Sequence, residues 1–262
     1  MAVIDKSIES PRALDRDQLM EMLRNMGDCG SIELKVSVPA QQRTAMSTLG
    51  LDVLNGRIRE VYFFDTPDLT LFHSGVVPRA RRTQGAPDDT VVKLRPVIVP
   101  ELPDVERTSP NLKVEMDITR AGYVVSASMK GQRPIGAVKE MTSGARSLER
   151  LFTKEQRLFF AAHKPAGVEW TDLVTLGPVY VVVLKFVPPG FGHKLVIEQW
   201  HYPGEVPLVE LSTKATPENL LTILPEAIEF LKTRGLSASG EQEPKTRKAL
   251  EYFTKRPAKS TA

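Results

Sequence analysis

The sequence has little cysteine, few aromatic residues and no long apolar run. Its single cysteine, Cys29, excludes a disulfide framework and a cysteine-based zinc site, and it fits a reducing compartment. The longest apolar run, Val179 to Leu184, has six residues, whereas a membrane span needs ~18. The first residues are polar and lack the apolar segment of a signal peptide. We therefore expect a cytoplasmic protein that does not associate with membranes.

The charges are nearly balanced, with 35 basic and 32 acidic residues among 262, for a net charge of +3. Hydrophobic residues make up 41% and charged residues 26%, which is typical of a globular protein and excludes collagen-like, coiled-coil and disordered chains. This balance gives no reason to expect a nucleic-acid partner. By position, we expect an N-terminal tail and helix over 1–28, a main domain over 29–234, and a C-terminal helix and tail over 235–262.

Hydrophobic periodicity predicts helices and strands along the whole chain. Apolar residues at helical spacing predict helices over 15–26, 40–49, 148–163, 216–234 and 244–254. Period-2 stretches predict strands over 31–38, 57–65, 76–83, 90–97, 112–119, 179–187, 193–202 and 206–214. The region 122–147 gives mixed signals, and a mobile excursion is expected there. Most connections are short, which predicts an α+β fold with about eight largely antiparallel strands, enough for a closed barrel with helices packed outside.

Charged residues share one face on several of these strands. Because side chains alternate along a strand, residues i and i+2 point to the same side. Pairs with this spacing are Glu33 and Lys35, Arg79 and Arg81, Lys93 and Arg95, and Glu115 and Asp117. Glu210 shares its face with Ser212 and Lys214, Glu198 with Lys194, and Lys185 lies in an otherwise apolar strand. On a single strand, such a face would simply meet solvent. Repeated on at least five strands, it predicts charged faces that converge inside a closed barrel.

A lumen lined in this way favours a phosphate ligand. Arginine and lysine bind phosphate oxygens, and arginine does so in bidentate fashion. Nearby carboxylates would repel a polyphosphate unless a divalent cation lay between them, and Mg²⁺ and Mn²⁺ take oxygens from carboxylates, phosphates and water. The strand faces therefore predict a site for a metal and a small-molecule triphosphate.

The same segments resemble signatures of the CYTH superfamily, the triphosphate tunnel metalloenzymes. VYFFDTPDLTLFHSGVVPRARR is similar to the second and third strands of the family, and DTVVKLRP to its Lys-x-Arg strand. KVEMD is similar to its Glu-x-Asp strand, SIELK to the first-strand Glu-x-Glu-x-Lys and LVELSTK to the last strand. The likeness covers about residues 31–214 and implies an eight-stranded antiparallel tunnel. The family includes inorganic triphosphatases, thiamine-triphosphatases, RNA triphosphatases and class IV adenylate cyclases, all of which handle a triphosphate with a divalent metal.

Two positions depart from the family pattern. Ser31 and Ser212 stand where the resemblance implies carboxylates. Serine is a neutral and weaker metal ligand, so three functions stay open. The leading one is a metal-dependent phosphohydrolase that acts on a triphosphate. The others are a class IV-like adenylate cyclase and a non-catalytic protein that binds polyphosphate or nucleotides. The sequence leaves the oligomeric state open, a homodimer included.

Roles for individual residues follow from the strand faces and the resemblance together. The predicted phosphate ligands are Arg79, Arg81, Lys93, Arg95 and Lys185. The predicted ligands of one or two Mg²⁺ or Mn²⁺ ions are Glu33, Glu115, Asp117, Glu198 and Glu210. Lys35 is the predicted catalytic residue, which either orients the attacking water or contacts phosphate.

Overall fold

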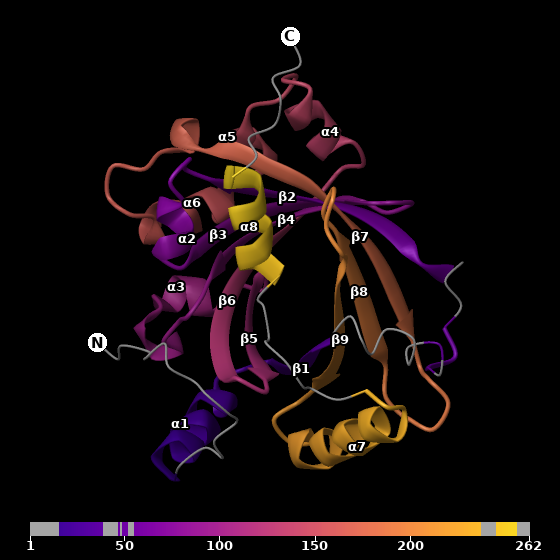
Figure 1. The fold of residues 1–262 in the computed structure, drawn as a ribbon. Coiled ribbons are helices and arrows are strands. Elements are labelled where there is room, and N and C mark those ends of the chain that lie inside the picture. Colours follow the sequence, from indigo (N-terminus) through magenta and orange to yellow (C-terminus); the bar gives the residue numbers. More distant parts are fainter. Residues whose placement is uncertain (1–15, 39–46, 48, 52–54, 237–244, 256–262) are drawn as a thin grey trace.

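The strands close into a single barrel. The computed structural model describes residues 16–38, 47, 49–51, 55–236 and 245–255, so the expected helix over 40–49 lies almost wholly outside the described residues. Nine strands follow one another around the barrel in the order β1-β5-β6-β4-β3-β2-β7-β8-β9 (Figure 1). They are β1 (Ser31–Val38), β2 (Arg57–Asp65), β3 (Val76–Thr83), β4 (Asp88–Leu94), β5 (Leu112–Thr119), β6 (Gly122–Arg133), β7 (Val174–Phe186), β8 (Leu195–His201) and β9 (Leu208–Ala215). The expected closed barrel is confirmed.

The barrel has one strand more than the expected eight, and it is mixed rather than wholly antiparallel. The additional strand, β6, lies in the region that was expected to be a mobile excursion, and it pairs with β4 and β5. Its inward residues include Ser126 and Ser128, and its outward ones include Ala127 and Met129, so small side chains weaken the contrast between its faces. Among the described strands, only β1 and β5 pair in parallel.

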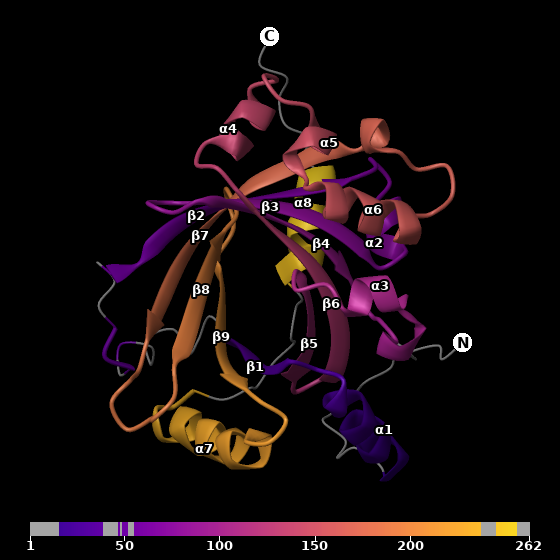
Figure 2. The same cartoon turned by 180° about the vertical axis from the view of Figure 1, so that it is seen from behind.

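Helices cover the outside of the barrel on two sides. The apolar faces of β1, β8 and β9 pack with α7 (Leu220–Thr233), and Met22 and Met26 of α1 (Arg16–Gly27) pack against the same cluster. A second cluster joins β3, β4 and β6 to α4 (Ala137–Thr142), α5 (Leu148–Leu151) and α6 (Lys154–His163). Figure 2 shows both groups from behind, with α7 at one end of the barrel and α4 to α6 at the other. The short helix α2 (Thr70–His73) lies between β2 and β3, and the short helix α3 (Asp104–Arg107) lies between β4 and β5.

The amphipathic segment predicted as one helix over 148–163 is two helices. Phe152 has extended backbone angles after α5, and Thr153 then caps α6. The Thr153 hydroxyl accepts a hydrogen bond from the Gln156 amide, and the Gln156 side chain accepts one from the Thr153 amide. This reciprocal capping box starts a new helix, and its competition with a continuous helix explains the break.

The last helix, α8 (Lys245–Lys255), lies between the walls of the barrel rather than outside it (Figure 1). Ala249 and Leu250 are 0% and 1% exposed. They pack in one cluster with Phe63, Val181 and Trp200, which the strand register places on the inward face. An apolar plug therefore fills one part of the lumen. Among the described residues, none of the helices has the length and apolar character to cross a membrane.

Candidate active site in the barrel lumen

The predicted site residues share the inward face of the barrel. Glu33 lies opposite Asp117 on β5 and Lys214 on β9, and Glu198 lies directly opposite Glu210. The other predicted residues also lie opposite partners on neighbouring strands, and such partners share a face of the sheet. These pairs are Lys35 with Ser212, Lys93 with Ser128 and Val77, Arg81 with Asp89 and Val61, and Lys185 with Val196. The opposite face of the same strands carries the apolar residues that the outer helices cover. The charged faces therefore converge inward, as the alternation predicts.

Four cations from β2, β3 and β4 form one side of the lumen, which we call the basic wall: Arg59, Arg79, Arg81 and Lys93. Arg79 has no ion pair with any residue that the structure describes. Burial and the neighbouring Arg81 lower the pKa of Arg79 to about 10. Burial, together with Lys35, Arg95 and Arg79, lowers the pKa of Lys93 to about 7, although Asp117 opposes the shift. The other three cations have carboxylate partners: Arg59 lies 3.3 Å from Glu198, Arg81 lies 2.7 Å from Asp89 and Lys93 lies 3.9 Å from Asp117. Among the described residues, the positive charge of the wall that no carboxylate pairs with is therefore that of Arg79.

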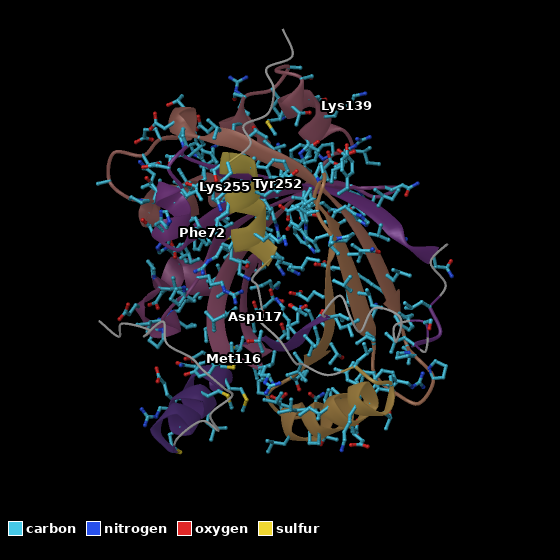
Figure 3. The ribbon with its side chains drawn as sticks, in the orientation of Figure 1. Phe72, Met116, Asp117, Lys139, Tyr252 and Lys255 are labelled. Carbon is cyan, nitrogen blue, oxygen red and sulfur yellow. The ribbon has the colours of Figure 1, made fainter. Side chains whose placement is uncertain are left out.

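A buried carboxylate, Asp117, organises the adjoining part of the lumen. Its oxygens lie 2.9 Å from Lys35 Nζ and 2.5 Å from Arg95 Nη1, and Lys93 Nζ is 3.9 Å away. Burial alone would raise the pKa of Asp117, but these three cations hold it far below its usual range. Lys35 also lies 3.3 Å from Glu33 Oε2. Figure 3 labels Asp117 beside Met116, whose side chain belongs to the outer core.

Glu115 on the same strand face has its own set of partners. Its carboxylate lies 2.6 Å from Lys214 Nζ and 3.7 Å from Lys130 Nζ, and Ser31 donates a 3.2 Å hydrogen bond to it. Burial opposes ionisation, but Lys214 and Lys130 prevail and lower the pKa of Glu115 to about 2. Ser31 is thus a hydrogen-bond donor to a carboxylate where the resemblance implied another carboxylate.

The third acidic group is the carboxylate pair of Glu198 and Glu210. One ammonium group, Lys245 Nζ at the start of α8, lies 2.6 Å from an oxygen of each. Glu198 also contacts Arg59 Nη1 at 3.3 Å and accepts a 3.2 Å hydrogen bond from Trp200 Nε1. Burial disfavours both charged forms, yet the pKa of Glu198 lies far below and that of Lys245 far above the usual range, because each group stabilises the charge of the other.

Sequence reasoning missed two side chains of the candidate site, Arg59 and Lys245. Arg59 shares the inward face with Val61 and Phe63 of β2, and the i, i+2 test on residues 57–65 would have included it. Lys245 carries no such signal, because a helix far from β8 and β9 in the sequence delivers it. Of the predicted phosphate ligands, Lys185 is exposed and has no ion pair with a described residue, and Arg95 is held by Asp117.

The described residues contain no ready-made metal centre: no three His, Cys, Asp or Glu side chains are grouped as metal ligands. Each of the five predicted metal ligands instead has a lysine or arginine partner. One place nonetheless has the chemistry of a cation site, because the oxygens of Glu198 and Glu210 converge on a single positive group. The Lys245 ammonium stands there as a cation supplied by the chain.

Comparison with known proteins agrees with this architecture. No family model and no curated protein matches the sequence. A solved "putative adenylate cyclase" from Bacillus halodurans superimposes with a TM-score of 0.58 at 16% identity, covering 84% of this chain and 98% of that one. The chain has a CYTH-like fold. A "putative adenylyl cyclase" from Hippeastrum, described as having a dominant triphosphatase activity, superimposes with a TM-score of 0.53 at 18% identity, covering 80% of this chain and 91% of that one.

Within the CYTH-like fold, the basic wall and the three acidic groups form one continuous site. Arg59 joins the wall to Glu198, and Lys93 joins it to Asp117. A linear anion lying along the wall would therefore meet acidic groups that already hold cations. Such an arrangement neutralises negative charge in steps along the lumen, which suits a chain of phosphoryl groups.

Proposed function

We propose that the protein binds a triphosphate along the basic wall and hydrolyses it. The observation that carries this proposal is Arg79, a half-buried guanidinium without an ion pair among the described residues, next to Arg81 and near Lys93. Removing like charges from water and crowding them costs free energy, and a bound polyanion offsets that cost. Phosphate oxygens accept charge-assisted hydrogen bonds from guanidinium groups in bidentate geometry.

The same residues supply the chemistry of hydrolysis. Water attacks the terminal phosphorus in line, and the bridging P–O bond breaks with its electron pair going to the pyrophosphate oxygen. The attacking water loses its proton to solvent, so that the products are orthophosphate and pyrophosphate. Most of the acceleration comes from cations already in place around the phosphoryl oxygens. Lys35, fixed between Glu33 and Asp117, is the proposed catalytic residue, either as the group that orients the water or as a phosphate contact.

A divalent cation is part of the proposal. Mg²⁺ is commonly bound through one or two carboxylates together with substrate phosphates and water. Glu198 and Glu210 are the residues that would hold it, and it would supply neutralisation of phosphate oxygens next to Arg59.

One assay separates the proposed function from its alternatives. The protein is incubated with tripolyphosphate and with ATP, with and without Mn²⁺, and the products are identified. Release of inorganic phosphate would support the triphosphatase, and formation of cyclic AMP would support the cyclase. Binding without turnover would leave a polyphosphate-binding protein and refute the hydrolase.

A further inference from the structure

Lys245 occupies the point at which two opposed carboxylates would otherwise repel each other. Glu198 and Glu210 are direct cross-strand partners on β8 and β9, and Glu210 is 8% exposed. Unpaired like charges at such a separation destabilise a fold. The ammonium lies 2.6 Å from each carboxylate and 5.5 Å from the centre of a Trp200 ring. The pair therefore requires a cation, and α8 provides one.

The ammonium holds together two groups of the same charge, at 2.6 Å from an oxygen of each. If it left, the opposed carboxylates would be unpaired, so another cation has to take its place. The carboxylates favour a small, hard ion, since Mg²⁺ and Mn²⁺ prefer carboxylate oxygens to other protein ligands.

The position of the ammonium is tied to the docking of α8. Lys245 is the first residue of the helix, and its carbonyl accepts a 3.3 Å hydrogen bond from Tyr202. Ala249 and Leu250, one turn further on, fill the apolar part of the lumen. Tyr252 donates a 2.6 Å hydrogen bond to the carbonyl of Pro203. The contacts that seat the helix thus also place Lys245 on the carboxylate pair.

We propose that Lys245 and a divalent cation compete for Glu198 and Glu210, so that α8 docks in the lumen only while the metal is absent. The helix is then an internal inhibitor of metal loading. Binding of the metal releases α8 and opens the apolar part of the lumen beside the basic wall. This inference rests on the proposed function only in taking the ligand to be a divalent cation.

The test measures Mn²⁺ affinity by electron paramagnetic resonance of the free ion. Lys245→Met keeps an apolar stem on α8 but removes the competing charge, and we expect it to bind Mn²⁺ at least about tenfold more tightly than the wild type. Lys255→Met is the matched control, because this lysine of the same helix has a side chain that is 76% exposed and lies away from the pair. It should bind Mn²⁺ as the wild type does. Equal affinity in all three proteins would refute the competition.

Hydrogen exchange tests the release of the helix without a variant that risks unfolding. In the wild type, Mn²⁺ should speed amide exchange in residues 246–255, and the double variant Glu198→Gln/Glu210→Gln should show no such response. Unchanged protection of α8 at saturating Mn²⁺ would overturn the inference. Neither measurement needs turnover, so a failed triphosphatase assay and a failed release experiment are told apart.

Discussion

Proton uptake on binding tripolyphosphate is a direct test of the basic wall. Lys93 faces the lumen with a pKa lowered to about 7, chiefly by burial. An anion bound beside it favours the charged ammonium and moves the pKa back up. Binding should therefore protonate Lys93, and the number of protons taken up depends on the pH.

The size of the effect follows from this pKa. With a pKa of about 7 in the free protein, Lys93 is about half charged at pH 7 and about one-tenth charged at pH 8. Complete protonation in the complex then takes up about 0.5 proton per site at pH 7 and about 0.9 at pH 8, with little uptake at pH 6. The uptake should rise with pH across this range.

Calorimetric titration in buffers with different ionisation enthalpies measures the uptake. Tripolyphosphate exchanges protons of its own, so the decisive quantity is the difference between the wild type and Lys93→Met. Lys139→Met, an exposed lysine on α4 labelled in Figure 3, is the control and should behave as the wild type does. Equal proton uptake by the wild type and Lys93→Met between about pH 6 and pH 8 would refute the picture of a partly neutral lysine in the phosphate site.

Three further predictions concern the same lumen. Arg79→Ala should weaken tripolyphosphate binding by about 1.5–3 kcal/mol in calorimetry. The control is Arg82→Ala, on the outer face of the same strand and paired with Glu60, which should leave the affinity unchanged. If Arg82→Ala weakened binding and Arg79→Ala did not, Arg79 would not be part of the site. The pKa of Glu115 is lowered to about 2, against 4.5 normally. The ionised carboxylate therefore contributes stability that is present above about pH 4.5 and is lost as the pH falls toward 2. Acid unfolding of Glu115→Gln should depend less on pH in that window, and an unfolding profile identical to that of the wild type would contradict the Lys214 ion pair. Ser31→Glu places a carboxylate beside Glu115 and should lower the melting temperature in chelator but raise Mn²⁺ affinity; no change in either would show that residue 31 faces solvent.

Period-2 alternation was sufficient to predict the charged lining. It placed Glu33, Lys35, Lys93 and Asp117 on inward faces because the outer faces of their strands are apolar and covered by helices. Alternation gives the face of a residue but not its partner. The ion pair of Lys35 with Asp117 depends on β1 lying parallel to β5. The two strands are far apart in the sequence, because the register pairs Leu34 with Ile118, 84 residues later.

What the sequence did not predict depends on weak local contrast or on long-range contacts. The strand β6 was not predicted because serine and alanine alternate in it, and neither residue is strongly polar or apolar. The break at Phe152 depends on a capping box that competes with helical periodicity. Lys245 could not be assigned, because its role is fixed by where α8 docks and no spacing within 245–255 encodes that position.

The order of the strands also bears on how the protein folds. β1 is made first, yet both of its neighbours, β5 and β9, come later, and β9 ends at Ala215. Until β9 has been synthesised, one edge of β1 has open amides and carbonyls, which are a template for pairing with another chain. Contacts that span so much of the sequence form slowly. Newly made chains therefore pass through a stage in which the charged lining is exposed to solvent and the barrel is an open, aggregation-prone sheet.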